Sequence, residues 1–414
     1  MQPSTAPPPA LRIVLSLPVL IAALGYFVDV YDLLIFNIVR VPSLTDLGLS
    51  EKDISLVGSR ILNFQQAGLL LGGILWGILG DKRGRLSVLF GSIITYSLAN
   101  IACGFVASAE AYAWLRFVAG LGLAGELGAG ITLVSEVLPK QLRGYGTSVV
   151  AGVGLMGAVA AFLTMNSTGN WRLTYFIGGG LGLALLLLRI GVLESGMYKQ
   201  LRETTVQRGN FGAFFTNGDR FMRYLHCMGI ALPTYFVIGI LATFSNEFGK
   251  ALGIGEAILP GKCVMYMYIG TAAGDLFSGL FSQWLKSRKG TIGWMMAFAA
   301  AFVTVYLSGL INSSTVFYFV CGLMGFGIGY IAMFLTVTAE SFGTNVRATA
   351  TTSVANNVRA TTLLTIPLFQ YLKTLPQLGV LGAGAVVGLL CFTLAAWSLA
   401  ALGETYGKEL DYSE

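Results

Sequence analysis

Segments of about twenty predominantly apolar residues recur along the whole chain, and short polar connections separate them. A helix needs roughly 20 such residues to cross the hydrocarbon core of a bilayer. The candidate segments begin near Ile13, Ile54, Leu86, Ala111, Tyr145, Trp171, Phe221, Lys262, Thr291, Ser314, Ala348 and Gly379. The sequence therefore predicts an all-α membrane protein with twelve transmembrane helices.

The charged residues are too few for a water-soluble surface. They make up 11% of the chain, whereas soluble domains contain about 25% charged residues. One His and five scattered Cys argue against a His/Cys metal site or a disulfide framework, so we expect no metal and no cofactor. The first apolar segment, from about Ile13 to Val39, is longer than the apolar core of a signal peptide, and we expect a retained membrane helix.

Lys and Arg are concentrated in alternate connections between the segments. With the N-terminus inside, the cytoplasmic connections hold about seventeen of the twenty-six, in agreement with the positive-inside rule. We therefore expect a protein of a bacterial-type inner membrane with both termini in the cytoplasm. Its expected parts are an N-terminal tail (1–12), a six-helix bundle (13–192), a cytoplasmic linker (193–220), a second six-helix bundle (221–402) and a C-terminal tail (403–414).

Two landmarks recur about two hundred residues apart. Glu136 ends the fourth predicted helix and Arg143 follows seven residues later, while Glu340 ends the tenth helix and Arg347 follows at the same spacing. The basic loop after the second helix, GILGDKRGR, has a degraded counterpart after the eighth, GLFSQWLKSRK. Chance recurrence in a Gly-rich chain is the alternative. The matching positions favour two parallel six-helix repeats that face each other across a central cavity.

Several motifs give the chain a resemblance to a known family. They are GDKRGR between the second and third helices, RFVAGLGLAGE (Arg116 to Glu126) followed by E-x-x-P-x-x-x-R-G, VDVYDLLIFN (Val28 to Asn37) in the first helix, and ESGMYKQL (Glu194 to Leu201) after the sixth. With them the chain resembles the major facilitator superfamily, and within it the metabolite–proton, phosphate–proton and sugar-porter branches. Ser282 and Gln283 stand where the second basic loop of that family usually has an Asp. The resemblance implies transport by alternating access.

Carboxylates inside the predicted helices are candidates for proton coupling, because a charge in the hydrocarbon is costly and marks function. Asp29 and Asp32 lie three residues apart, on one face of the first helix and in its outer half, so that each should raise the other's pKa. The alternative is a structural pair with an outer-end Arg such as Arg60. Glu126 lies near mid-bilayer and is a third candidate, unless it serves only to bond neighbouring helices.

Arg359 is about 17 Å into the eleventh predicted helix, and an Arg cannot lose its charge by deprotonation. It therefore needs an anion. Its partner is either a carboxylate or phosphate of the substrate, which the guanidinium fits geometrically, or a fixed ion pair with Glu126 or Asp32. We also expect substrate contacts from the adjacent amides and from two aromatic residues of neighbouring helices. These candidates are Asn356, Asn357, Tyr235 and Tyr266.

Opposite charges at the cytoplasmic ends of adjacent helices suggest a latch between conformations. The candidates are Asp81, Arg85, Glu136, Arg143, Glu340 and Arg347. Positive-inside anchoring is the simpler interpretation, but it does not account for the acids. We expect Asp275, in the eighth helix, to pair with Arg347 or Glu340.

The expected function is secondary active transport, with proton-coupled uptake of a small organic or inorganic anion. A facilitator or symporter of a neutral solute such as a sugar, or an exporter, stays open. An enzyme is not expected, because no His/Cys metal cluster or Ser/His pair is available. The expected partners are a small-molecule substrate, protons and the lipid bilayer, with no nucleic acid, and the protein is expected to be a monomer.

Overall fold

The computed structural model describes residues 16–83, 85–125, 143–194, 217–343 and 346–408, and in these ranges it contains helices and no strand. The helices before the linker are α2 (Leu17–Asp46), α3 (Glu51–Arg83), α4 (Arg85–Cys103), α5 (Ala109–Leu123), α7 (Arg143–Thr168) and α8 (Trp171–Glu194). Those after it are α9 (Gly218–Gly229), α10 (Leu232–Phe236), the π-helix η3 (Val237–Ala242), α11 (Ser245–Ala251), α12 (Pro260–Leu285), α13 (Arg288–Leu307), α14 (Ser314–Ile328), α15 (Ile331–Ser341), α16 (Arg347–Ala360), α17 (Thr362–Leu372) and α18 (Gly379–Ala401).

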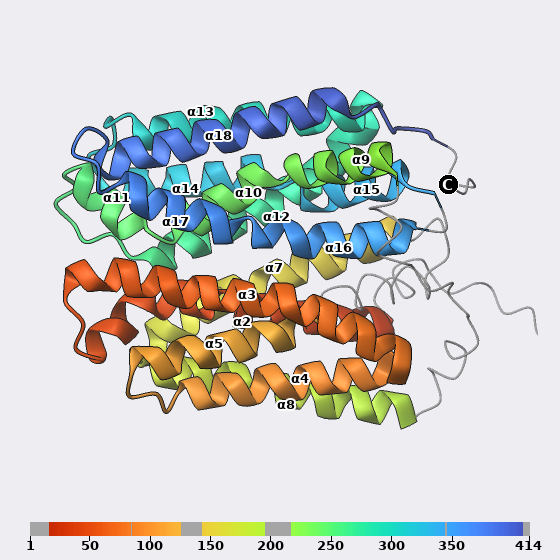
Figure 1. The fold of residues 1–414 in the computed structure, drawn as a ribbon, viewed down its shortest axis with the longest axis horizontal. Helices are drawn as coiled ribbons and strands as arrows, with labels where there is room; N and C mark the ends of the chain where they lie inside the picture. The colour runs from red at the N-terminus through yellow and green to blue at the C-terminus, as the bar shows by residue number, and fades with distance from the viewer. Residues whose placement is uncertain (1–15, 84, 126–142, 195–216, 344–345, 409–414) are drawn as a thin grey trace, which may run out of the picture.

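The helices form two groups, α2 to α8 and α9 to α18, which lie one above the other in Figure 1. We call these groups the first and second halves. Neighbouring pairs repeat between the halves: α3 packs on α5 as α12 packs on α14, and α4 packs on α8 as α13 packs on α18. We call the end where α8 ends and α9 begins the linker end, and the other the opposite end. The same arrangement in both halves supports the predicted internal repeat.

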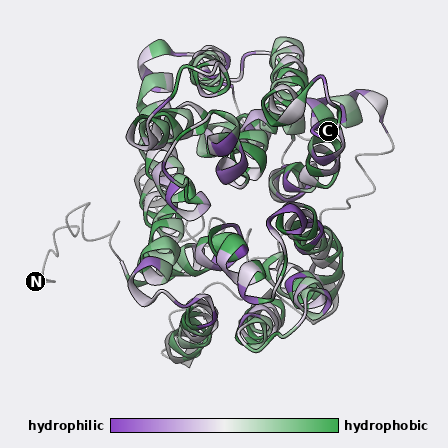
Figure 2. Cartoon of the chain, turned by 90° about the vertical axis from the view of Figure 1, so that its left-hand side faces the viewer, coloured by the Kyte–Doolittle hydropathy of each residue, from purple (hydrophilic) through white to green (hydrophobic). Residues whose placement is uncertain are grey.

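The surface of the helices is suited to a bilayer. Figure 2 looks along the helices and shows that much of their length consists of hydrophobic residues. Phe105, Leu280 and Trp284 each expose 74% or more of their area, which water would solvate poorly. Among the described residues six helices are long and apolar enough to cross a membrane, or seven if the bent pair α9–η3 is one span. A helix begins within four residues of each of the twelve predicted starts, so the all-α prediction is confirmed, while twelve crossings stay a prediction.

Glycines bring the equivalent helix pairs of the two halves into close contact. A Cβ added at Gly68 of α3 would overlap the carbonyl oxygen of Phe117 on α5. A Cβ added at Gly274 of α12 would likewise overlap the carbonyl oxygen of Phe326 on α14. Small residues allow helix backbones to approach in membranes, where dispersion contacts replace the hydrophobic effect.

Two predicted spans of the second half are broken near their middle, which the sequence analysis did not foresee. The chain bends by 43° between α9 and α10, where Pro233 lacks the N–H that would bond the preceding turn. The other break, at Gly329 and Tyr330, separates α14 from α15. The Tyr330 hydroxyl donates to the carbonyl of Ile230 at the first break, over 3.0 Å. The two breaks therefore lie against each other and satisfy a carbonyl that the bend leaves available.

Asp275 does not form the ion pair that we expected. In the described structure its Oδ1 accepts a hydrogen bond of 2.8 Å from the backbone N–H of Ala332, in the first turn of α15. The side chain is 9% exposed. The break at Gly329 creates a helix N-terminus inside the protein, and its free N–H groups need an acceptor. The predicted pairing with Arg347 or Glu340 was wrong because a broken helix could not be read from the sequence.

This cap can be tested by comparing two substitutions. We expect Asp275→Ala to reduce the free energy of unfolding by about 1 kcal/mol or more, because the cap is lost. Asp275→Asn keeps an oxygen acceptor and should lie close to wild type. Unfolding titrations in mixed detergent micelles would measure both variants. Equal losses in the two variants would contradict a capping role.

Candidate functional site

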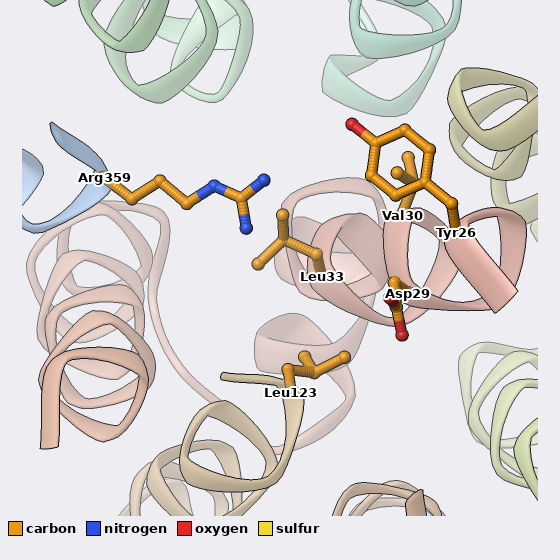
Figure 3. Close-up of a pocket in the computed structure, with 6 residues that line it drawn as sticks. All are labelled: Tyr26, Asp29, Val30, Leu33, Leu123 and Arg359. Carbon is orange, nitrogen blue, oxygen red and sulfur yellow. The ribbon is translucent and has the colours of Figure 1, made fainter. Parts of the chain in front are cut away.

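A small pocket lies between the two halves near the middle of the helices (Figure 3). Its volume is about 200 Å³, including space open to solvent. Residues of α2, α5 and α16 line it, namely Tyr26, Asp29, Val30, Leu33, Leu123 and Arg359. It therefore combines an apolar lining with one cationic and one acidic side chain, each contributed by a different half.

Arg359 extends from α16 into this pocket (Figure 3). Its Nε donates to the hydroxyl of Tyr235 over 3.3 Å. Its Nη1 is buried and has no acceptor among the described residues. Because a guanidinium carries five donors and no acceptor, it has capacity left for an anion. The predicted position of Arg359 near the midplane is consistent with its place twelve residues into α16.

Asp29 and Asp32 do not point to the same place. Asp29, 4% exposed, lines the pocket together with Tyr26 and Leu33. Asp32, 0% exposed, faces α8 instead: a Cβ added at Gly178 would lie 2.6 Å from its Oδ1. Both lie near the middle of α2 rather than in its outer half, because this helix continues to Asp46. The structure thus brings Asp29, but not Asp32, to the pocket that Arg359 lines.

The missed pocket residues follow a simple helical spacing. Tyr26, Asp29, Val30 and Leu33 are related as i, i+3, i+4 and i+7, so they share one face of α2. Once Asp29 is chosen, this periodicity names the others. Leu123 has no comparable signal, because an apolar residue in an apolar helix does not indicate which way it faces.

Arg116, which we left without a role, is a buried anchor of the first half. It is 0% exposed. Its Nε donates to Oε1 of Gln65 (3.2 Å), its Nη1 to Oδ1 of Asn100 (2.7 Å), and its Nη2 to the main-chain carbonyl of Asp32 (3.0 Å). The Arg near Asp32 is therefore Arg116. Arg60, considered as a partner, instead forms an exposed ion pair of 2.9 Å with Glu110.

The remaining predicted substrate contacts lie in different places. Tyr235 is bonded to Arg359. Asn357 donates through Nδ2 to the hydroxyl of Tyr224 over 2.8 Å. Asn356 lies three residues before Arg359, and its buried Oδ1 has no donor among the described residues.

Tyr266 does not line the pocket: its ring stacks on Tyr318, with centroids 5.9 Å apart. The pocket thus brings together Asp29 and Arg359, with Tyr235 beside it.

Part of the predicted latch at the linker end can be described. Glu136 of the latch lies outside the described residues, as does Glu126, the candidate for proton coupling. Asp81 is in the last turn of α3, Arg85 begins α4 and Arg143 begins α7, so their backbones lie at this end.

In the second half, Glu340 forms an ion pair of 3.3 Å with Arg288 and accepts a bond of 2.7 Å from the Thr405 hydroxyl. Arg347 donates through Nε to the carbonyl of Ala339 over 2.8 Å.

The segment after α18 is tied into the same region through Glu404. Its carboxylate accepts bonds from the Ser287 hydroxyl and from the backbone N–H of Arg288 and Lys289, at the start of α13. Burial acts to raise the pKa of Glu404, but these bonds and those from its own following backbone outweigh it and hold the pKa below its usual value. The carboxylate is therefore a helix cap that stays ionised at neutral pH.

Polar bonds join the two halves at the opposite end, and we call this set the seam. Asn37 bonds Thr243 over 2.6 Å, and Lys250 pairs with Glu51 over 2.6 Å. The other seam bonds are those of Arg40 with Thr243 (2.9 Å) and Asn246 (3.1 Å), of Gln370 with Ser55 (3.1 Å) and Ser59 (2.5 Å), and of Lys373 with Ser55 (2.6 Å). The seam closes the opposite end over the pocket.

Comparison with known proteins agrees with this geometry. A family model described as Major Facilitator Superfamily matches residues 22–359. The chain is 25% identical to a probable 4-methylmuconolactone transporter of Cupriavidus pinatubonensis, over 94% of this chain and 90% of the relative. It is 24% identical to a gentisate transporter of Corynebacterium glutamicum, over 78% and 73%. Among solved structures, the proton:xylose symporter XylE superposes with a TM-score of 0.69 at 15% identity, over 95% of this chain and 97% of that one.

Proposed function

The chain belongs to the major facilitator superfamily, and from this premise we propose that it takes up a small organic carboxylate together with protons. The substrate would bind in the pocket between the halves, and the halves would open alternately at their two ends. We propose that the linker end faces the cytoplasm, as the Lys and Arg distribution predicts. We also propose the division into two tails, two six-helix bundles and a linker that the sequence predicts, and a monomeric protein.

The observation that carries this proposal is Arg359 in the pocket. Its buried Nη1 has no acceptor among the described residues, and a buried donor left without an acceptor is costly. A carboxylate can accept two parallel bonds from a guanidinium. The apolar residues Val30, Leu33 and Leu123 surround the rest of the pocket, which suits a carboxylate with an apolar body. The two relatives support the class, since gentisate is an aromatic carboxylate and the other is named for an organic-acid lactone.

Asp29 is our candidate for the proton site. It is 4% exposed and lines the same pocket as Arg359, so substrate and proton would meet there. Protonation of Asp29 would remove a negative charge that repels an entering carboxylate. Asp32 and Glu126 stay as further candidates from the sequence. A neutral solute is the second possibility, and the solved xylose symporter shares the fold, but a carrier of neutral solutes has little need for a cation in its pocket.

The proposal can be tested with purified protein in liposomes. We expect radiolabelled gentisate to accumulate when the interior is more alkaline than the outside, and a protonophore to abolish accumulation. Xylose serves as the neutral control and benzamide as the uncharged aromatic control. Uptake of xylose but not of gentisate, benzoate or cis,cis-muconate would contradict the carboxylate class. Carboxylate uptake that does not change with the pH gradient would contradict proton coupling but not the carboxylate class.

A further inference from the structure

Arg40 is a second fully buried arginine, and it lies in the seam rather than in the pocket. It belongs to α2 and is 0% exposed. Its Nη2 donates to the carbonyl of Thr243 over 2.9 Å and to Oδ1 of Asn246 over 3.1 Å. Its guanidinium carbon lies 4.5 Å from the centre of the Phe244 ring. All of these partners belong to the second half, whereas Arg40 belongs to the first.

The hydrogen bonds of Arg40 are incomplete in this closed seam. Nε and Nη1 are both buried and have no acceptor among the described residues. Arg116 shows the contrast, because it is equally buried and donates from Nε, Nη1 and Nη2 within its own half. A buried cation with unmet donors destabilises the state that buries it. The bonds of Arg116 can therefore persist when the halves move apart, whereas those of Arg40 cannot.

Opening of the seam would release the guanidinium of Arg40. Its acceptors Thr243 and Asn246 would leave with the second half. Within its own half, the Arg40 side chain packs against Gly58, where an added Cβ would lie 2.7 Å from Cδ of Arg40. This contact stays in the first half and would hold the side chain in position. Lys373 would lose its bond of 2.6 Å to Ser55 of the first half in the same motion, but it would keep its ion pair of 2.7 Å with Glu247 of its own half. Arg40 would then face the opening without its seam partners.

We propose that Arg40 is an anion-binding site at the outer opening, which holds the carboxylate of the substrate before it reaches Arg359. This inference rests on the proposed carboxylate uptake. Along α2, Arg40 lies eleven residues beyond Asp29, about 16 Å at the rise of a helix, so it is a separate position from the pocket. A guanidinium freed from its seam partners presents its planar fork to a carboxylate.

The test uses an inhibitor that can bind from one side only. Benzoate attached to a long polyethylene glycol chain cannot cross the membrane, and we would measure its inhibition of gentisate uptake in right-side-out and inside-out membrane vesicles. We expect Arg40→Gln to weaken outside inhibition about tenfold and to leave inside inhibition within about twofold. Arg40→Lys, which keeps the charge, should regain part of the loss. Lys250→Gln removes an exposed seam cation that already has a partner and should change little.

If Arg40 served only to hold the seam closed, its substitution would strengthen inhibition from outside instead of weakening it. Gln370→Leu removes the seam bonds to Ser55 and Ser59, and should strengthen outside inhibition by favouring the open state. If Arg40 only closed the seam, Arg40→Gln would do the same, and the proposal would be overturned. Equal weakening on both sides, or no change in either Arg40 variant, would also overturn it. Normal gentisate uptake by the wild type that the attached benzoate does not inhibit from outside would overturn this inference alone. No gentisate uptake by the wild type would instead mean that the proposed function has failed, and this inference with it.

Discussion

Replacement of Arg359 by Gln is expected to lower kcat/KM for gentisate uptake by about 30-fold or more. Truncating one partner of a buried charge pair costs about 2–5 kcal/mol, and each 1.4 kcal/mol is a factor of ten. Arg359→Lys keeps the charge but loses the fork and the bond to Tyr235, so it should recover only part of the rate. Initial uptake rates in proteoliposomes would measure both variants.

The matched control is Arg60→Gln, which removes an exposed arginine from an ion pair with Glu110. Such surface pairs contribute roughly 0–1 kcal/mol, so this variant should transport like wild type. A protein that transports gentisate normally after Arg359→Gln would show that Arg359 does not hold the substrate. In that case the guanidinium would be a structural group, and the neutral-solute interpretation would regain its place.

Replacement of Asp29 by Asn is expected to abolish accumulation while preserving exchange. Asn fills the same space but cannot bind a transferable proton, so the pH gradient no longer drives the substrate. A gradient of one pH unit gives about tenfold accumulation for each coupled proton, and in Asp29→Asn the ratio should fall to about one. Exchange of internal for external gentisate needs no net proton movement and should continue. Both quantities can be measured in the same proteoliposomes.

The variant Asp32→Asn distinguishes the roles of the two carboxylates of α2. Asp32 faces α8, beside the Arg116 anchor, so we expect its substitution to lower stability more than coupling. Loss of accumulation in Asp32→Asn, together with normal accumulation in Asp29→Asn, would move the proton site from the pocket to the interior of the first half. Loss of both exchange and accumulation in Asp29→Asn would indicate a binding role for Asp29.

The helix positions could be predicted from the sequence because a bilayer imposes a length of apolar chain that is easy to count. The helix starts near Trp171, Ser314 and Gly379 were predicted to the residue. The breaks at Pro233 and Gly329 were not predicted, because Pro and Gly are common in membrane helices and do not by themselves indicate a break. A break depends on what bonds the free groups, and here Tyr330 and Asp275 come from distant parts of the chain.

The site was partly predictable for a similar reason. A charge inside an apolar helix is visible in the sequence, and Arg359 and Asp29 were found in this way. The direction of each side chain was not visible: Asp29 and Asp32 differ by three residues and yet face different neighbours. Arg40 follows the first apolar segment, which ends at about Val39, whereas α2 continues to Asp46. Its burial depends on Thr243 and Asn246, about two hundred residues away.

The broken helices also mean that a count of ionisable side chains understates the electric field inside this protein. Each helix terminus carries about half an elementary charge, positive at the N-terminus and negative at the C-terminus. The breaks place four such termini in the interior, namely the ends of α9 and α14 and the starts of α10 and α15. Asp275 offsets the charge at the start of α15, and the Tyr330 hydroxyl donates to the end of α9. Main-chain dipoles therefore act in the second half as fixed partial charges, which cannot be titrated or removed by substituting a single side chain.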